Sequence, residues 1–289
     1  MDELERLRAE VETLRRKVRS LEGAPSPSSA LEIPFDELDL RDRVGGGGFS
    51  VVYRALWRGT PVAVKRWLDP HHSERALAEF RREVMTAQDL RHPHCVQLLG
   101  HCSSPQNPCI VFEHLPFTLH GVLHGGGAAV IDRKRALSFA LDIARALAHL
   151  HSRRPAVIHR DVKPANFLVD RAYKVKLCDF GLCDATDADA GTPNYMAPEL
   201  LAKKPYAEKV DVYAFGVVLW EMLAREVPFD GLAAGEIKRS VLEGRRPEMP
   251  LSVPGPTRAL VVECWDQDAG KRPGCDAIID RLNALIKAA

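Results

Sequence analysis

Two polar loops, each attached to apolar runs, constrain the fold of this chain more than any other feature of its sequence. In VIHRDVKPANFLVD (157–170), two strand-like apolar runs bracket a polar loop, and in VKLCDFG (175–181) a further apolar run ends at an aspartate. Short apolar runs bounded by polar residues are typical of buried strands. The sequence therefore predicts a globular domain that carries polar loops at strand ends. The polar residues concerned are His159, Arg160, Asp161, Lys163, Asn166 and Asp179.

Length and composition set the limits for this domain. At 289 residues, 46% of them hydrophobic, the chain can bury the core of one large domain or of two lobes. Forty basic and thirty-nine acidic residues leave a formal charge of +1. No global field therefore favours a nucleic acid or an anionic membrane as a partner.

No segment predicts a membrane or secretory destination. The N-terminus MDELERLRAE lacks an apolar signal region, and the most apolar stretch, VYAFGVVLWEML, is short and contains Glu221. The seven cysteines show neither a C-x-x-C pair nor zinc spacing, which favours reduced thiols. We therefore expect a soluble cytoplasmic protein that has no membrane span and no nucleic acid partner.

The first twenty-two residues carry a heptad pattern. Two valines at a positions and leucine at each d position favour a parallel two-stranded coiled coil. About three heptads are marginal on their own, so residues 3–22 are predicted to assist parallel homodimerisation. A single amphipathic helix packed on the main domain is the alternative. The seam is Leu4, Leu7, Val11, Leu14, Val18 and Leu21, and the expected pairs between chains, all opposite in sign, are Glu3–Arg8, Glu10–Arg15 and Lys17–Glu22.

The rest of the chain divides into a linker and one globular region. Residues 23–33 are rich in proline and serine and predict a linker, whereas the pattern from 34 to 288 is first rich in strands and later in helices. VVYRALW and PVAVKRWL are predicted strands with a turn at residues 58–60. Residues 73–90 predict an amphipathic helix, and residues 134–151 predict a long buried helix.

One lysine and one glutamate in the first half of this region are candidates for a charge pair. In PVAVKRW, strand alternation places Ala63 and Lys65 on one face, and Val62 and Val64 on the other. Glu83 lies on the apolar side of its helix, where a carboxylate needs a cation such as Lys65. The alternatives are a surface lysine on an edge strand and a solvated glutamate on a charged helix.

The two polar loops hold the residue types that metal-assisted phosphoryl transfer requires. That chemistry needs a carboxylate to orient a hydroxyl, a cation for developing charge, and oxygen ligands for Mg²⁺. Asp161, Lys163, and Asn166 with Asp179 can supply these in turn. A polar turn explains either loop alone, but it does not explain both together with Lys65 and Glu83.

These residues belong to an ordered series of motifs: VGGGGFSVVY, VAVK, Glu83, HRDVKPAN, DFG, GTPNYMAPE, DVYAFG and KRP. The series resembles the eukaryotic protein kinase catalytic domain over about residues 34–288. VVYRALWRGTPVAVK and VVECWDQDAGKRP are similar to the tyrosine-kinase-like group, which includes Raf-like and mixed-lineage-like kinases. The resemblance implies an α+β, two-lobed fold. A small antiparallel β-sheet lobe with one helix (about 34–115) would precede a larger, mainly helical lobe (about 116–288).

The resemblance also implies a site for ATP and Mg²⁺. The glycine run would cover the phosphates with Phe49 at its tip, Glu83 would fix Lys65 on the α- and β-phosphates, and Phe112 would be the gatekeeper before the hinge. The implied nucleotide-binding residues are Val44, Gly45, Gly46, Gly47, Gly48, Phe49, Ser50, Val51, Val52, Ala63, Lys65, Glu113, Leu115 and Leu168.

Further roles follow from the same resemblance. Asp161 would be the catalytic base, Lys163 would steady the γ-phosphate, and Asn166 and Asp179 would hold Mg²⁺. Lys163 together with Thr192 resembles the pattern of serine/threonine kinases, so the implied substrate is a Ser or Thr hydroxyl of a protein. Glu199 would pair with Arg272, and Asp211 would brace the catalytic loop.

The chain departs from the family pattern at two positions and has a short activation segment. Ser50 replaces the last glycine of the loop, and Ala87 thins the regulatory stack that Leu98, Phe180 and His159 complete. Both departures keep open a pseudokinase or scaffold that binds without turnover. A third alternative makes the coiled coil the main functional unit, with the kinase fold as its cargo. We hypothesise that Thr186, among aspartates, is an activating phosphorylation site. Cys178 is either a thiol open to electrophiles or a buried structural thiol.

Overall fold

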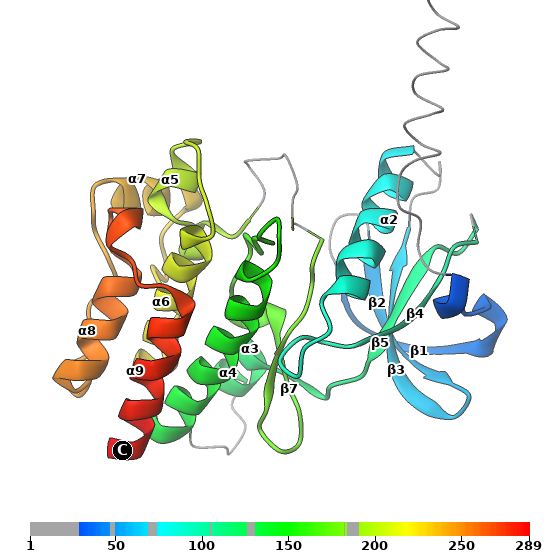
Figure 1. The fold of residues 1–289 in the computed structure, drawn as a ribbon, viewed down its shortest axis with the longest axis horizontal. Coiled ribbons are helices and arrows are strands. Elements are labelled where there is room, and N and C mark those ends of the chain that lie inside the picture. The colour runs from blue at the N-terminus through cyan, green and yellow to red at the C-terminus, as the bar shows by residue number, and fades with distance from the viewer. Residues whose placement is uncertain are drawn as a thin grey trace, which may run out of the picture.

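The computed structural model describes most of the chain, and Figure 1 shows two lobes, with the sheet and α2 on the right and the helices α3 to α9 on the left. The predicted α+β two-lobed fold is confirmed. The predicted coiled coil, most of the linker, Gly47, Gly48, Phe49 and Thr186 lie outside the described residues. The described residues are 29–46, 50–68, 74–104, 106–125, 131–181, 183 and 191–289.

The small lobe is built on a five-stranded antiparallel sheet in the order β1-β2-β3-β5-β4. Alternation along β3 buries Val62 and Val64 completely in a core beneath the sheet and leaves Ala63 and Lys65 on the opposite face. The predicted hairpin turn lies at Arg58 and Gly59, both with positive φ. The strands are β1 Leu38–Gly46, β2 Ser50–Trp57, β3 Thr60–Trp67, β4 Leu98–Cys102 and β5 Cys109–Glu113.

Helix α2 (Glu74–Asp89) is amphipathic, as predicted. Phe80, Val84 and Ala87 repeat at helical spacing and are buried, and the Phe80 ring packs edge-on against Trp67 at a centroid distance of 5.3 Å. Glu83 lies on the same buried face and is 3% exposed. A carboxylate is thereby placed inside the lobe, facing β3.

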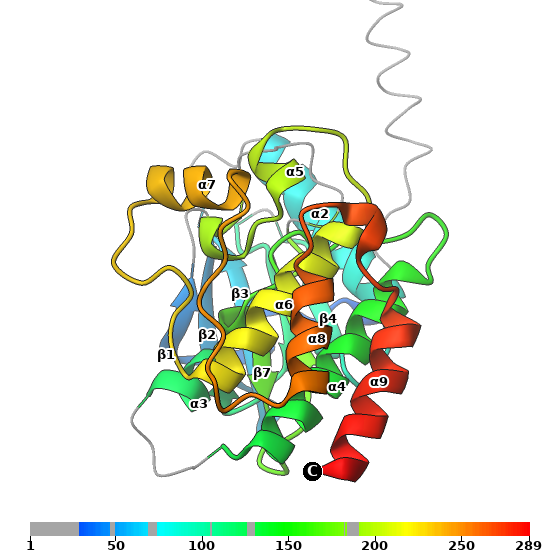
Figure 2. The same ribbon diagram turned by 90° about the vertical axis from the view of Figure 1, so that its left-hand side faces the viewer.

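The large lobe surrounds the buried helix α6. Residues 210–222 of α6 are buried on all sides, because α4 and α8 pack against it (Figure 2). At Gly216 a Cβ atom would come within 2.8 Å of the Cβ of Cys264, so the close approach of α6 and α8 requires glycine. The helices are α3 Leu119–His124, α4 Arg133–His151, α5 Pro198–Leu201, α6 Lys209–Ala224, α7 Ala234–Leu242, α8 Gly255–Cys264 and α9 Cys275–Ala288.

Short elements complete both lobes. A three-stranded antiparallel sheet in the order β6-β7-β8 lies where the lobes meet and carries the two polar loops. None of the described helices combines the length and apolar composition needed to cross a bilayer. These strands are β6 Phe117–Thr118, β7 Phe167–Val169 and β8 Val175–Leu177, and the 3-10 helices are η1 Ser29–Leu31, η2 Phe35–Glu37, η3 Pro164–Asn166, η4 Pro193–Tyr195 and η5 Ala269–Lys271.

Backbone hydrogen bonds connect the two lobes directly. The loop between α2 and β4 runs beside β8, so that the N–H of Val96 donates to the carbonyl of Leu177 at 2.8 Å and the N–H of Leu177 donates to that of His94 at 2.8 Å. Because β8 leads into Cys178 and Asp179, the loop that carries Asp179 is held by the small lobe as well as by the large one.

Candidate active site

Three charged side chains from different elements meet at the opening between the lobes. Nζ of Lys65 on β3 lies 2.8 and 2.9 Å from the two carboxylate oxygens of Glu83 on α2, and 2.8 Å from Oδ1 of Asp179 after β8. The side chains of Lys65 and Glu83 are 14% and 3% exposed, whereas that of Asp179 is 46% exposed. The predicted Lys65–Glu83 contact is therefore present, and Asp179 is the member open to solvent.

The protonation of this cluster follows from its geometry. Burial opposes the charge of Lys65, but the carboxylates of Glu83 and Asp179 outweigh it and hold the pKa of Lys65 above its usual value. The nearby ammonium in turn lowers the pKa of Asp179 to about 2. At neutral pH the cluster thus presents an ionised carboxylate and an ammonium group where the two lobes meet.

The loop before β7 forms a second cluster around Asp161. Nζ of Lys163 lies 2.7 Å from Oδ2 of Asp161 and donates to Oγ1 of Thr192 at 2.9 Å. Nδ2 of Asn166 donates to Oδ2 and to the backbone carbonyl of Asp161, at 2.9 and 2.8 Å. The structure thus brings together Asp161, Lys163, Asn166 and Thr192, all four of which were predicted to be site residues.

Asp211, in the first turn of α6, anchors this loop from behind. Its Oδ2 accepts the N–H of His159 at 2.8 Å and the imidazole Nε2 of His151 at 2.9 Å, while Oδ1 accepts the N–H of Arg160 at 2.8 Å. Arg160 has a φ of 68°, so these bonds hold the backbone in a left-handed conformation that an arginine seldom adopts. These contacts support the prediction that Asp211 braces the catalytic loop.

His151, in this anchor, has a strongly raised pKa. Burial opposes protonation of its ring, but hydrogen bonds with Asp211 and Cys275 outweigh it and raise the pKa of His151 to about 10. This role of His151 could not be predicted from the sequence, because His151 is the last residue of α4 and lies far from Asp211 along the chain.

The expected nucleotide-binding residues of the small lobe are partly described. Gly45 and Gly46 end β1, and each pairs with a residue of β2, Val52 and Val51 respectively. Gly46 has a φ of 156°, and a Cβ atom there would come within 2.8 Å of the carbonyl of Ser50. Glycine is therefore required at Gly46 by the tight approach of the two strands. Val44 is exposed, and Val52 pairs across the sheet with Lys65.

The connection between the lobes carries a contact that the sequence analysis missed. Glu113 ends β5, and its carboxylate accepts Nζ of Lys176 on β8 at 2.7 and 2.8 Å. Its Oε1 also accepts the N–H of Gln97 at 2.8 Å. Leu115 follows and is buried, and Leu168 on β7 pairs in register with Lys176. Lys176 thus fixes the predicted hinge residue Glu113 to the large lobe.

The four residues of the predicted regulatory stack are buried. Ala87, Leu98, Phe180 and His159 are all buried in one core cluster or against it, and the His159 and Phe180 rings meet edge-on at 6.1 Å. The Sγ of Cys178 donates to the carbonyl of Asn166 at 3.3 Å, and burial raises the pKa of its thiol. A thiol that resists ionisation reacts slowly with electrophiles, which supports the structural alternative for Cys178.

The donor atoms of the site suit a magnesium nucleotide. Mg²⁺ prefers oxygen ligands, and Asp179 supplies an ionised carboxylate and Asn166 a carboxamide. Asn166 is fixed through the two hydrogen bonds of its Nδ2. Opposite them, the ammonium of Lys65 is positioned to meet phosphate oxygens.

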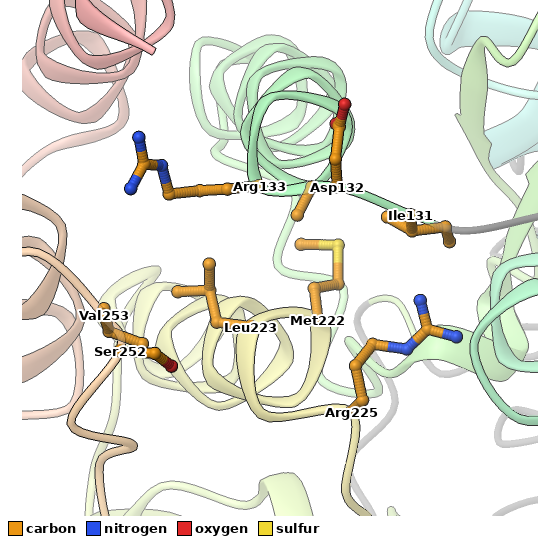
Figure 3. Close-up of a pocket in the computed structure, with 9 residues that line it drawn as sticks. Ile131, Asp132, Arg133, Met222, Leu223, Arg225, Ser252 and Val253 are labelled. Carbon is orange, nitrogen blue, oxygen red and sulfur yellow. The ribbon is translucent and has the colours of Figure 1, made fainter.

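A cavity of about 210 Å³ lies elsewhere in the large lobe, between the start of α4, the end of α6 and the loop before α8 (Figure 3). Asp132, which caps α4, and Arg225, which ends α6 with a left-handed conformation, stand at its edge. None of the predicted site residues lines this cavity. The lining residues are Ile131, Asp132, Arg133, Ala136, Met222, Leu223, Arg225, Ser252 and Val253.

The last predicted contact of the large lobe is an ion pair between α5 and the segment before α9. The guanidinium of Arg272 donates to both carboxylate oxygens of Glu199, at 2.6 and 2.9 Å, and the Arg272 side chain is fully buried. Such a two-pronged pair fixes orientation as well as distance. It holds the segment that follows Thr192 against the helical core.

Comparison with known proteins identifies the family that the sequence motifs resemble. The family model of the protein kinase domain matches residues 38–282. The chain is 39% identical over 269 residues to serine/threonine-protein kinase CTR1 of Arabidopsis thaliana, covering 90% of this chain and 33% of that protein. It is 37% identical over 260 residues to the probable serine/threonine-protein kinase drkD of Dictyostelium discoideum, covering 88% of this chain and 20% of that protein. The chain therefore spans between a fifth and a third of the length of these two relatives.

Proposed function

Because this chain belongs to the protein kinase domain family, we propose that it transfers the γ-phosphoryl group of ATP to Ser and Thr hydroxyls of protein substrates, with Mg²⁺. One observation carries the proposal: the cluster of Lys65, Glu83 and Asp179 and the cluster around Asp161 both lie at the meeting of the two lobes. The two relatives described above are named as serine/threonine kinases, one of them as a probable one, which supports the choice of acceptor.

Each residue then has a defined task. Lys65, held by Glu83, binds the phosphates of ATP, and Asn166 and Asp179 hold Mg²⁺, which neutralises developing charge on the phosphates when bound. The carboxylate of Asp161 orients the acceptor hydroxyl and takes its proton. Lys163 lies beside Asp161 and is positioned to stabilise the transferring phosphoryl group.

Thr192 gives a reason for the preference for serine and threonine. Its hydroxyl donates to Oδ1 of Asp161 at 3.3 Å and accepts a hydrogen bond from Lys163. This bridge ties the segment after the activation loop to the catalytic loop at a short distance. Where the two segments lie this close together, a short aliphatic hydroxyl fits beside Asp161 more readily than a hydroxyl at the end of an aromatic ring.

Three further proposals concern parts of the chain outside the described residues or beyond the fold. Residues 3–22 assist parallel dimerisation, Thr186 is an activating phosphorylation site, and the protein acts in the cytoplasm. The domain boundaries are 1–22, 23–33 and 34–288. A chain that begins at Ser29 should lose concentration-dependent dimers in sedimentation experiments, and Thr186→Ala should lower activity; unchanged behaviour would contradict the respective proposal.

The decisive experiment compares the wild type with Asp161→Asn in transfer from labelled ATP, with Mg²⁺, to a generic Ser/Thr substrate and to the protein itself. We expect activity to fall by about 10²–10⁴-fold, because the proton acceptor is lost. Asp230→Asn, an exposed aspartate, is the matched control. Equal background signal from wild type and Asp161→Asn would instead indicate a scaffold that binds without turnover.

A further inference from the structure

Three side chains of the types that bind transition metals converge between α3 and α6. His120 and His124 lie one helical turn apart on α3, with ring centroids 4.9 Å apart, and Glu221 faces them from α6. One ligand atom from each of the three lies within 4.8 Å of the others, and no other such group occurs among the described residues. His120 is exposed, His124 is half-buried and Glu221 has no exposed surface, so the group opens to solvent from one side only.

Glu221 is a charged residue in an otherwise apolar segment. It interrupts VVLWEML, the apolar second half of a helix that is buried on all sides, where an apolar residue would normally be found. A carboxylate in such a place needs positive or hydrogen-donating partners. Its Oε1 accepts Nε2 of His124 at 2.8 Å, and its Oε2 accepts the hydroxyl of Tyr195 at 2.8 Å.

The geometry points to a binding site for a divalent transition metal ion, Zn²⁺ in the first place, with His120, His124 and Glu221 as ligands. Two imidazoles and one carboxylate with a fourth position open to water are a known set for zinc. Tetrahedral bonds of about 2 Å place ligand atoms roughly 3.3 Å apart. When the ion binds, the 2.8 Å contact between Nε2 of His124 and Oε1 of Glu221 therefore lengthens slightly. The exposed His120 side chain rotates towards the ion.

A supporting shell is also present. The hydroxyl of Tyr195 donates to Oε2 of Glu221, which leaves Oε1 for the ion and fixes the plane of the carboxylate. Mg²⁺ prefers oxygen ligands only, so the two imidazoles select against the ion that the phosphoryl transfer uses. The two sites are therefore chemically distinct.

Tyr195 connects this site to the substrate side of the active site. It ends η4, three residues after Thr192, whose hydroxyl contacts Asp161 and Lys163. An ion on Glu221 fixes the carboxylate that accepts the Tyr195 hydroxyl, and hence the position of the segment that carries Thr192. We expect Zn²⁺ to change the KM for the protein substrate and to leave the KM for ATP unchanged, a consequence that rests on the proposed kinase function.

Binding is tested without any assay of activity. The full chain, freed of metal with a chelator and kept without nucleotide, is titrated with Zn²⁺ in a calorimeter and with Co²⁺ in an absorption spectrometer. We expect one ion per chain, and an at least tenfold weaker affinity in His120→Ala, which removes an exposed ligand without disturbing the core. His120→Asp, which retains a ligand atom, should recover part of the affinity.

His92→Ala is the matched control, because His92 stacks on His149 at 4.7 Å in the other histidine-rich region. Affinity unchanged in His120→Ala, affinity lost in His92→Ala, or a strong thiolate-to-cobalt absorption band would each overturn the site. If Zn²⁺ binds as expected but the KM for the substrate does not move, the site stands and the coupling through Tyr195 is wrong. Absence of kinase activity in the wild type assayed with Mg²⁺ and without Zn²⁺ would contradict only the proposed function.

Discussion

The two clusters of charge in this molecule differ in how their carboxylates are satisfied. In front, Asp179 pairs with Lys65 and accepts a backbone hydrogen bond from Gly181, and almost half of its side chain faces solvent. Behind the catalytic loop, Asp211 is 1% exposed, and both of its oxygens accept hydrogen bonds from three donors of the protein itself. The same functional group is thus half exposed to solvent at one place and buried among three protein donors at the other.

This difference separates reactivity from rigidity. An exposed carboxylate with spare acceptor capacity can bind an ion and release it, at little cost to the fold. A buried carboxylate that accepts three hydrogen bonds from the protein contributes to stability and to the position of the loop that it holds. Changes in front should therefore alter kinetics with little loss of stability, and changes behind should alter stability first.

The largest expected effect is at the front. Asp179→Asn should lower kcat by at least about 10²-fold, because a ligand for Mg²⁺ and a charge opposite the phosphates are lost. The free energy of unfolding should change by no more than about 1 kcal/mol, since the group is half exposed and Lys65 keeps Glu83. Parallel rate and urea-unfolding measurements check both parts. A loss of stability as large as that of Asp211→Asn would remove the distinction between the clusters.

Behind the loop, Asp211→Asn should reduce the free energy of unfolding by about 3 kcal/mol, because the amide leaves a charged His151 and a backbone N–H without an acceptor. Urea unfolding measures the effect, and Asp230→Asn serves as the exposed control. A variant that unfolds at the wild-type urea concentration would show that the loop is held by other contacts.

His151 should make the stability of the rear cluster depend on pH. Its pKa is raised from 6.5 to about 10 in the folded state, so its contribution is complete below pH 6.5 and is lost as the pH rises towards 10. Between pH 7 and pH 9 the wild type should lose about 1–2 kcal/mol more than His151→Gln. Identical pH profiles for the two proteins would show that His151 is neutral in the folded state.

The smallest effect is expected at the hinge. Lys176→Met should raise the KM for ATP about three- to tenfold with kcat unchanged, because Glu113 loses a partner worth about 1 kcal/mol. Lys176→Arg should restore the wild-type KM. Lys174→Met, an exposed lysine two residues earlier, is the control. A fall in kcat with constant KM would place Lys176 outside nucleotide positioning.

Local patterns predicted much of this arrangement. Alternation in PVAVKRW placed Lys65 on the face of β3 opposite Val62 and Val64, and helical spacing placed Glu83 on the buried face of α2, where the two meet. The family resemblance correctly indicated the contact between Glu199 and Arg272 and the position of Asp211. In each of these cases the motif or the period of the element carries the information.

Contacts between distant segments without a shared pattern could not be predicted. Lys176 lies in a strand of three residues, too short for alternation to distinguish a surface lysine from a paired one, and Glu113 is 63 residues away. Tyr195 and Glu221 meet only because η4 packs on α6. The coiled coil and Thr186 lie outside the described residues and stay predictions.

Helix α6 fixes the distance between two segments of the candidate active site. Asp211, near the start of α6, holds the catalytic loop. Glu221, near the end of α6, holds Tyr195, the last residue of the short helix η4 that follows Thr192. Ten residues of α-helix separate the two anchors by about 15 Å. Because α6 is packed on all sides, its helical rise fixes the spacing between the loop that Asp211 holds and the segment that Glu221 holds through Tyr195. Loops on the surface can vary while that spacing stays constant.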